Sequence, residues 1–267
     1  MKYKISLYSI IVVLLLNTAY AKLKELVIPG TGDSSQILKI LSDDFSKINK
    51  NIKILIPPSI GSSGGIKGLV EKKFEIARVA GDQSKKINKF KLKYTKFADS
   101  PIVFAIHKSV KNISQLSESQ IKQLYSGEIK FWHEISKSQK GKKVYLLGRE
   151  KGDSSRKTIQ KAWPDFKTTQ DSKTVFSTDE LKELLTRHPF TLGYLPFSRL
   201  PKECHLLVIN QEDPKLYIRK PNYKYKLTVP FGLVYKDNLS APAKMFLKYL
   251  SSDRAKKLLI KNRVRPL

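Results

Sequence analysis

Cysteine is nearly absent from this sequence, since Cys204 is the only one among 267 residues. A small secreted fold held together by disulfide bonds is therefore excluded. Histidine is also scarce, and neither its four residues nor Cys204 have the spacing of metal ligands. We therefore expect no metal site and no cofactor.

The chain also lacks the apolar run that a membrane-spanning helix needs near its start. Lys2 and Lys4 precede an apolar stretch at residues 10–16, and Ala19-Tyr20-Ala21 follows it. This pattern is typical of a secretory signal peptide at residues 1–21, cleaved after Ala21. A membrane anchor is the alternative, but the stretch is shorter than the roughly 18 residues that span a bilayer. We expect a periplasmic protein whose mature chain is long enough for one large domain or two lobes.

Acidic residues are few compared with basic ones. Asp and Glu number 23 against 51 Lys and Arg, which gives a formal net charge of +28. Such a field attracts anions and invites nonspecific binding to nucleic acid or anionic membranes. The lysines are spread along the chain without a basic block or a basic-aromatic motif. We therefore expect no specific nucleic-acid partner, and a largely solvated basic surface.

Expected strands and helices alternate along the chain, which indicates α/β architecture with mostly parallel sheets. The run at residues 101–106 is continuously apolar, as in a strand buried on both faces. The lysine-rich residues 84–96 are expected to form a solvated surface. Ser177 and Glu180 form a capping box, which predicts a helix start.

Three segments share one order: an apolar strand, a turn rich in glycine and hydroxyl residues, and a helix start. The turns lie at residues 30–35, 61–65 and 152–155. Free N–H groups and the positive end of a helix dipole make such a turn suitable for an anion. A buried oxyanion must be surrounded by donors, which backbone amides, hydroxyls and a bidentate arginine can provide. The candidates are Ser34, Ser35, Ser62, Ser63, Ser154, Ser155 and Arg149.

Each of these serines, taken alone, has an ordinary helix N-cap as its alternative explanation. Gly32-Asp33-Ser34 also raises the possibility of an esterase with Ser34 as nucleophile. That chemistry needs a histidine base, which GDSL-type esterases supply from an Asp-x-x-His motif. None of the four histidines has an aspartate three residues before it. Three similar turns in one chain favour oxyanion binding, without catalysis.

Several short motifs follow the order of a known family. They are Gly30-Thr31-Gly32-Asp33-Ser34-Ser35, Gly61-Ser62-Ser63-Gly64-Gly65-Ile66-Lys67, Leu124-Tyr125-Ser126-Gly127-Glu128-Ile129 with Trp132, residues 149–156, Gly193-Tyr194 and residues 264–267. With them the sequence resembles the periplasmic phosphate-binding components of ABC transporters, the PstS family. The resemblance covers nearly the whole mature chain.

The resemblance implies a type II periplasmic-binding-protein fold: two α/β lobes joined by a two-strand hinge, with the ligand cleft between them. One lobe would comprise residues 22–106 plus 226–267, and the other residues 107–225. By position, Ser34 and Ser35 match the family's first binding loop and Ser62 its second. Arg149 matches the phosphate-clamping arginine, and Asp153, Ser154 and Ser155 match the Ser-Gly-Thr that follows it.

Two departures from the family concern acidic residues. The family's aspartate that accepts the proton of a protonated phosphate falls near Ala80, with Arg78 close by as a further candidate for ligand contact. The family's acidic partner of the clamping arginine falls at Lys151. Asp33 or Asp153 would then take the acceptor role. Since a carboxylate repels fully ionised sulfate, we expect phosphate to bind better than sulfate.

The resemblance implies a monomeric solute-binding protein that is not an enzyme. It would capture inorganic phosphate, or a closely related oxyanion, and deliver it to an inner-membrane ABC permease. The alternative is an exported accessory protein of the same fold that binds polyanions or envelope components through its basic surface, without transport.

Overall fold

The computed structural model describes residues 23–267. The predicted signal peptide lies outside these residues. The strands are β1 (Lys24–Val27), β2 (Ile52–Leu55), β3 (Ile76–Ala80), β4 (Lys93–His107), β5 (Gln115–Leu116), β6 (Tyr145–Arg149), β7 (Lys173–Val175), β8 (Thr191–Pro196), β9 (Cys204–Ile209), β10 (Thr228–Tyr235) and β11 (Arg265–Pro266).

The helices alternate with these strands, as the sequence predicts. They are α2 (Ser35–Ile48), α3 (Gly61–Val70), α4 (Ser84–Lys89), α5 (Glu118–Ser126), α6 (Ser154–Ala162), α7 (Thr178–Arg187), α8 (Pro214–Arg219), α9 (Ala241–Leu250) and α10 (Asp253–Lys261), with short 3-10 turns η1 (Trp132–Glu134), η2 (Lys137–Gln139) and η3 (Phe197–Arg199). No helix within residues 23–267 is long and apolar enough to cross a membrane.

The sheets are mixed, so the expectation of mostly parallel sheets is wrong. β1 pairs with β2 in a two-stranded parallel sheet. The large sheet has nine strands, with β3, β10, β4, β8, β6 and β7 as its main path. β10 and β8 run antiparallel to β4, whereas β6 runs parallel to both β7 and β8. Apolar runs do not encode strand direction, which depends on long-range pairing.

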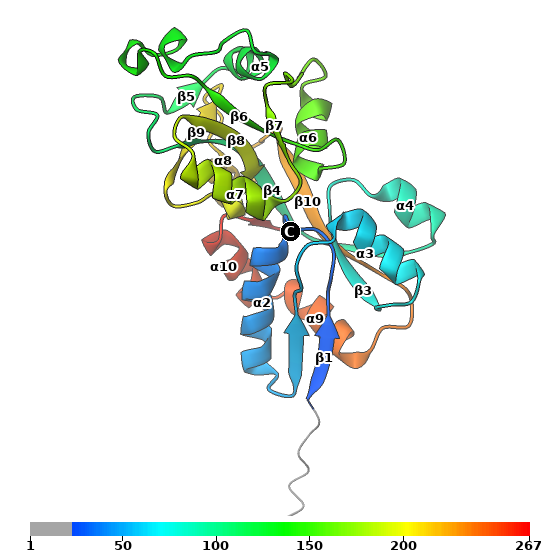
Figure 1. The fold of residues 1–267 in the computed structure, drawn as a ribbon. Coiled ribbons are helices and arrows are strands. Elements are labelled where there is room, and N and C mark those ends of the chain that lie inside the picture. Colours follow the sequence, from blue (N-terminus) through cyan, green and yellow to red (C-terminus); the bar gives the residue numbers. More distant parts are fainter. Residues whose placement is uncertain (1–22) are drawn as a thin grey trace, which may run out of the picture.

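β4 links two groups of elements, which Figure 1 shows one above the other. Its first part, from Lys93 to Pro101, pairs with β10, and residues 102–106 pair with β8. The side chains from Ser100 to His107 are all buried, as the apolar run predicts. The lysine-rich residues 84–96, expected to form a solvated surface, form α4 and the start of β4.

Gly30 ends the turn after β1 in a conformation that favours glycine, with a φ of +137°. A Cβ placed there would lie 1.9 Å from the backbone oxygen of Arg78. That close approach joins β1 to β3 through the backbone bonds Thr31 N–H to Arg78 O (3.1 Å) and Arg78 N–H to Pro29 O (2.8 Å). β3 therefore fixes the position of the turn at residues 30–35.

Candidate functional site

A cavity of about 450 Å³ lies where the strand–turn–helix segments meet. Its walls come from the β1–α2 turn, the β2–α3 turn, the segment after β3, the β6–α6 turn and the β7–α7 turn. Each follows the carboxyl end of a strand, which is where open α/β sheets bind ligands. The three predicted turns therefore converge, together with a fourth at the start of α7.

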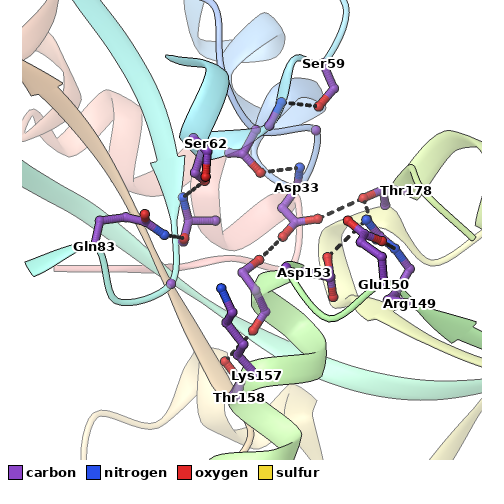
Figure 2. Close-up of a pocket in the computed structure, with 18 of the residues that line it drawn as sticks. Asp33, Ser59, Ser62, Gln83, Arg149, Glu150, Asp153, Lys157, Thr158 and Thr178 are labelled. Carbon is purple, nitrogen blue, oxygen red and sulfur yellow. Dashed lines mark hydrogen bonds and ion pairs between the residues drawn. The ribbon is translucent and has the colours of Figure 1, made fainter. Parts of the chain in front are cut away.

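Arg149 is the last residue of β6, and its side chain is buried at the inner end of the cavity. Nη2 lies 3.0 Å from Oδ2 of Asp153, and Nη1 donates to Oγ1 of Thr178 at 3.2 Å. Nε lies 3.2 Å from Oε2 of Glu150. The backbone N–H of Arg149 donates to the hydroxyl of the buried Tyr194 at 3.0 Å. The guanidinium is thus held by groups of the β6–α6 turn and of the start of α7 (Figure 2).

Asp153 connects Arg149 to the start of α6. One carboxylate oxygen pairs with Arg149, and the other accepts the backbone N–H of Arg156 at 2.8 Å as the helix N-cap. Burial, together with the nearby carboxylate of Asp33, raises the pKa of Asp153 to about 7. Asp153 and Glu150 are therefore the acidic partners of Arg149, whereas the position that matches the family's acidic partner is Lys151.

Asp33 is a buried carboxylate that joins opposite walls of the cavity (Figure 2). Thr178 donates its hydroxyl to Oδ1 at 2.8 Å, and Ser154 donates its hydroxyl to Oδ2. Asp33 precedes α2, whereas Ser154 and Thr178 begin α6 and α7. These hydrogen bonds therefore join the start of α2 to the starts of α6 and α7 across the cavity.

The cavity brings together five of the nine predicted ligand residues. They are Ser62, Ser63, Arg149, Asp153 and Ser154. The hydroxyl of Ser62 accepts the backbone N–H of Ala80 at 3.1 Å, which orients the segment after β3. The hydroxyl of Ser63 accepts a hydrogen bond from Nζ of Lys86.

Four predicted ligand residues do not line the cavity. The hydroxyl of Ser35 donates to Gly32 O at 2.7 Å and stabilises its own turn. The hydroxyls of Ser34 and Ser155 are buried without a hydrogen-bond partner among residues 23–267. An esterase would need a histidine hydrogen-bonded to its nucleophile, and Ser34 has none among the described residues.

Arg78 is the fourth, and the structure places it away from the cavity for a clear reason. Its side chain is fully buried, and it donates to the backbone oxygens of Thr31 (2.7 Å), Pro57 (2.7 Å) and Ile28. These bonds occupy the guanidinium and join the segments that follow β1 and β2. Its position two residues before Ala80 does not bring it into the cavity, because these three backbone oxygens hold its guanidinium among the segments that follow β1 and β2.

Thr178 and Glu150 are site residues that were missing from the predicted set. Thr178 follows the predicted capping box at Ser177, which the structure confirms as the N-cap of α7. This box had the same hydroxyl-then-helix pattern as the three turns but lacked their glycines. The pattern alone could have identified it.

Comparison with known proteins supports the predicted family and fold. A family model described as the PBP superfamily domain matches residues 17–254. The phosphate-binding protein PstS of Borreliella burgdorferi is 26% identical over 199 residues, which are 70% of each chain. PstS of Staphylococcus epidermidis is 21% identical over 243 residues, which are 85% of this chain and 74% of that protein.

Two solved structures have the same fold. One is a substrate-binding protein from Clostridium perfringens with bound phosphate, at a TM-score of 0.79 and 24% identity over 91% of this chain and 100% of that one. The other is an ABC-type phosphate transport receptor from Vibrio cholerae, at a TM-score of 0.65 and 19% identity with the same coverage.

Proposed function

We propose that this chain, which belongs to the PBP superfamily, captures inorganic phosphate or a closely related oxyanion and delivers it to an ABC permease. In this role it acts as a periplasmic solute-binding protein without a catalytic step, and as a monomer. The relatives named PstS support the choice of ligand. The observation that carries it is the convergence of Arg149 with hydroxyl-bearing helix starts on one cavity.

The donors of the cavity suit a tetrahedral oxyanion. Ser62 supplies a hydroxyl, and the first turns of α3, α6 and α7 supply backbone N–H groups and positive helix ends. Arg149 adds a planar set of charged donors. Together they replace the water that an anion loses on burial.

Ligand binding in this proposal is coupled to a hinge motion of two lobes. β4 changes its pairing partner between Pro101 and Ile102, and the N–H of Ile102 donates to Leu227 O at 2.7 Å. This favours a hinge at residues 101–102, shortly before the boundary expected at residue 106, and at Leu227, shortly after the boundary expected at residue 225. Opening would separate Asp33 from Ser154 and Thr178.

The two buried aspartates have different roles in this proposal. Asp153 serves as the acidic partner of Arg149, because both of its oxygens are engaged by Arg149 and the α6 backbone. Asp33 is the proton acceptor for a protonated phosphate, since its described partners are neutral hydroxyls from the facing wall. A carboxylate in that place disfavours a ligand with no proton to donate.

Thermal unfolding in the presence of oxyanions tests the proposed function. Phosphate at 100 times its dissociation constant should stabilise the folded protein by about 2.7 kcal/mol. For a chain of this size that corresponds to a rise in Tm of about 5–10 °C. No response to phosphate, arsenate, sulfate or phosphonate would contradict the proposal and favour an accessory protein that binds polyanions, with affinity that falls steeply with salt.

Asp33→Asn tests the assignment of the proton acceptor. The variant should reduce the preference for phosphate over sulfate by about tenfold or more, because losing one charge repulsion is worth roughly 1.4 kcal/mol or more in a buried site. Calorimetric titration with both anions measures this ratio. Asp82→Asn, which removes an exposed carboxylate from the same cavity, is the matched control. An unchanged ratio in Asp33→Asn would exclude Asp33 as the acceptor.

A further inference from the structure

We propose that the cavity contains a second anionic subsite, formed by Lys86, Lys157 and Lys161. Besides inorganic phosphate, the cavity would then accept a ligand with two linked anionic groups, at least one of them a phosphoryl group. This inference rests on the proposed function, because it takes the phosphate site at Arg149 as the first subsite.

The second subsite lies along the outer part of α6. Ser154, Lys157, Thr158 and Lys161 are three or four residues apart, so they share one face of the helix, and all four line the cavity. At 1.5 Å of rise per residue, Lys161 lies about 10 Å along the axis from Ser154. Ser154 is half-buried beside Asp33, whereas Lys157 and Lys161 are exposed. The cavity therefore extends from the buried phosphate site toward solvent.

The size of the cavity exceeds what one inorganic ion requires. Its volume of about 450 Å³ falls within the 300–1,000 Å³ that is typical of pockets for small organic molecules. Phosphate has only five non-hydrogen atoms, so it occupies a small part of this volume. The wall also includes the cationic side chains of Lys86, Lys157 and Lys161, which suit a further charged group.

The charges of the cavity are divided unevenly between its two ends. Arg149 at the inner end is accompanied by Asp33, Glu150 and Asp153, whereas the three outer lysines have only Asp82 beside them in the wall. Within residues 23–267, none of the ammonium groups of Lys86, Lys157 and Lys161 takes part in a salt bridge. The uncompensated positive charge is therefore at the outer end.

The outer lysines come from two helices on opposite sides of the cavity, α4 and α6. Lys86 belongs to α4 and its Nζ donates to Ser63 at the start of α3, whereas Lys157 and Lys161 belong to α6. Figure 2 shows Lys157 extending from α6 beside the cleft whose far side carries Gln83. A ligand group held between α4 and α6 would contact both sides at once, as a phosphate at Asp33 and Arg149 would.

Calorimetric titration with inorganic pyrophosphate and inorganic phosphate at constant ionic strength tests this inference. Wild-type protein should bind pyrophosphate at least about tenfold more tightly than phosphate, because each additional ion pair contributes up to about 1 kcal/mol. Lys157→Ala with Lys161→Ala should abolish most of that advantage and change phosphate affinity by less than about threefold.

The matched control is Lys244→Ala with Lys248→Ala. These lysines are also exposed and four residues apart on a helix, α9, but they lie outside the cavity. The control removes the same net charge and should leave the pyrophosphate advantage intact. If it weakens pyrophosphate binding equally, the effect is that of the general field and the subsite is overturned.

The remaining outcomes separate this inference from the proposed function. Phosphate binding without any advantage for pyrophosphate would overturn the second subsite and leave the proposed function standing. Binding of neither anion would overturn both. Pyrophosphate binding that depends on Lys157 and Lys161, with phosphate too weak to detect, would support the subsite and contradict inorganic phosphate as the ligand.

Discussion

Replacing Arg149 with alanine should weaken phosphate binding by at least about 3 kcal/mol, or more than about a hundredfold in Kd. The guanidinium supplies charged donors in a buried site, where each hydrogen bond to a charged group is worth about 1.5–3 kcal/mol. Its loss also leaves the carboxylates of Asp153 and Asp33 close together without a buried cation. Isothermal calorimetry at pH 7 measures the change.

Arg187→Ala is the matched control for this prediction, because Arg187 is an exposed arginine of α7 that pairs with Glu183 on the surface. Its phosphate affinity should be unchanged. The double variant Arg149→Met with Asp153→Asn removes both charges together and should also lose binding. Normal phosphate affinity in either Arg149 variant would remove this residue from the site.

Replacing Arg78 with methionine should lower the free energy of unfolding by about 2 kcal/mol or more. Three backbone oxygens, of Thr31, Ile28 and Pro57, would lose their donor, at roughly 1–3 kcal/mol for each buried acceptor. Burial lowers the pKa of Arg78 to about 10, so removing the charge also relieves an unfavourable contribution on the order of 3 kcal/mol. The lost hydrogen bonds and the altered packing exceed that relief.

Urea unfolding at pH 7, compared with the exposed Arg219→Met, measures this change. Under conditions where the variant is folded, its phosphate affinity should stay within about threefold of wild type. Arg78→Lys, which keeps the charge but not the planar set of donors, should be intermediate in stability. Wild-type stability combined with a large loss of affinity would show that Arg78 contacts the ligand after all.

The contrast between Arg78 and Arg149 explains how far the sequence could predict the site. Arg149 ends β6, Arg78 lies in the middle of β3, and both are buried. Arg149 is followed by a turn and a capped helix, which are local features that the sequence displays. Arg78 is surrounded by carbonyl groups from the ends of two other strands, and no local pattern records that arrangement.

Adjacent serines illustrate the same limit at finer scale. Ser154 lines the cavity, whereas the hydroxyl of Ser155 is buried elsewhere. Successive residues of a helix point about 100° apart, and in α6 this rotation turns Ser155 away from the cavity that Ser154 lines. The sequence predicted both, because it could locate the helix start but not its rotation about the axis.

The sequence by itself determined the alternation of strands and helices, the helix starts at the hydroxyl-rich turns, and Arg149 as a charged residue beside one of them. These features depend on hydrogen bonds and apolar spacing within a few residues. The tertiary structure decided which turns meet, the antiparallel pairing of β4, the exclusion of Arg78, and the linking of Asp33 to Ser154 and Thr178. Those outcomes depend on contacts between residues distant in sequence, from 21 positions apart for Arg78 with Pro57 to 121 for Asp33 with Ser154, which local patterns do not encode.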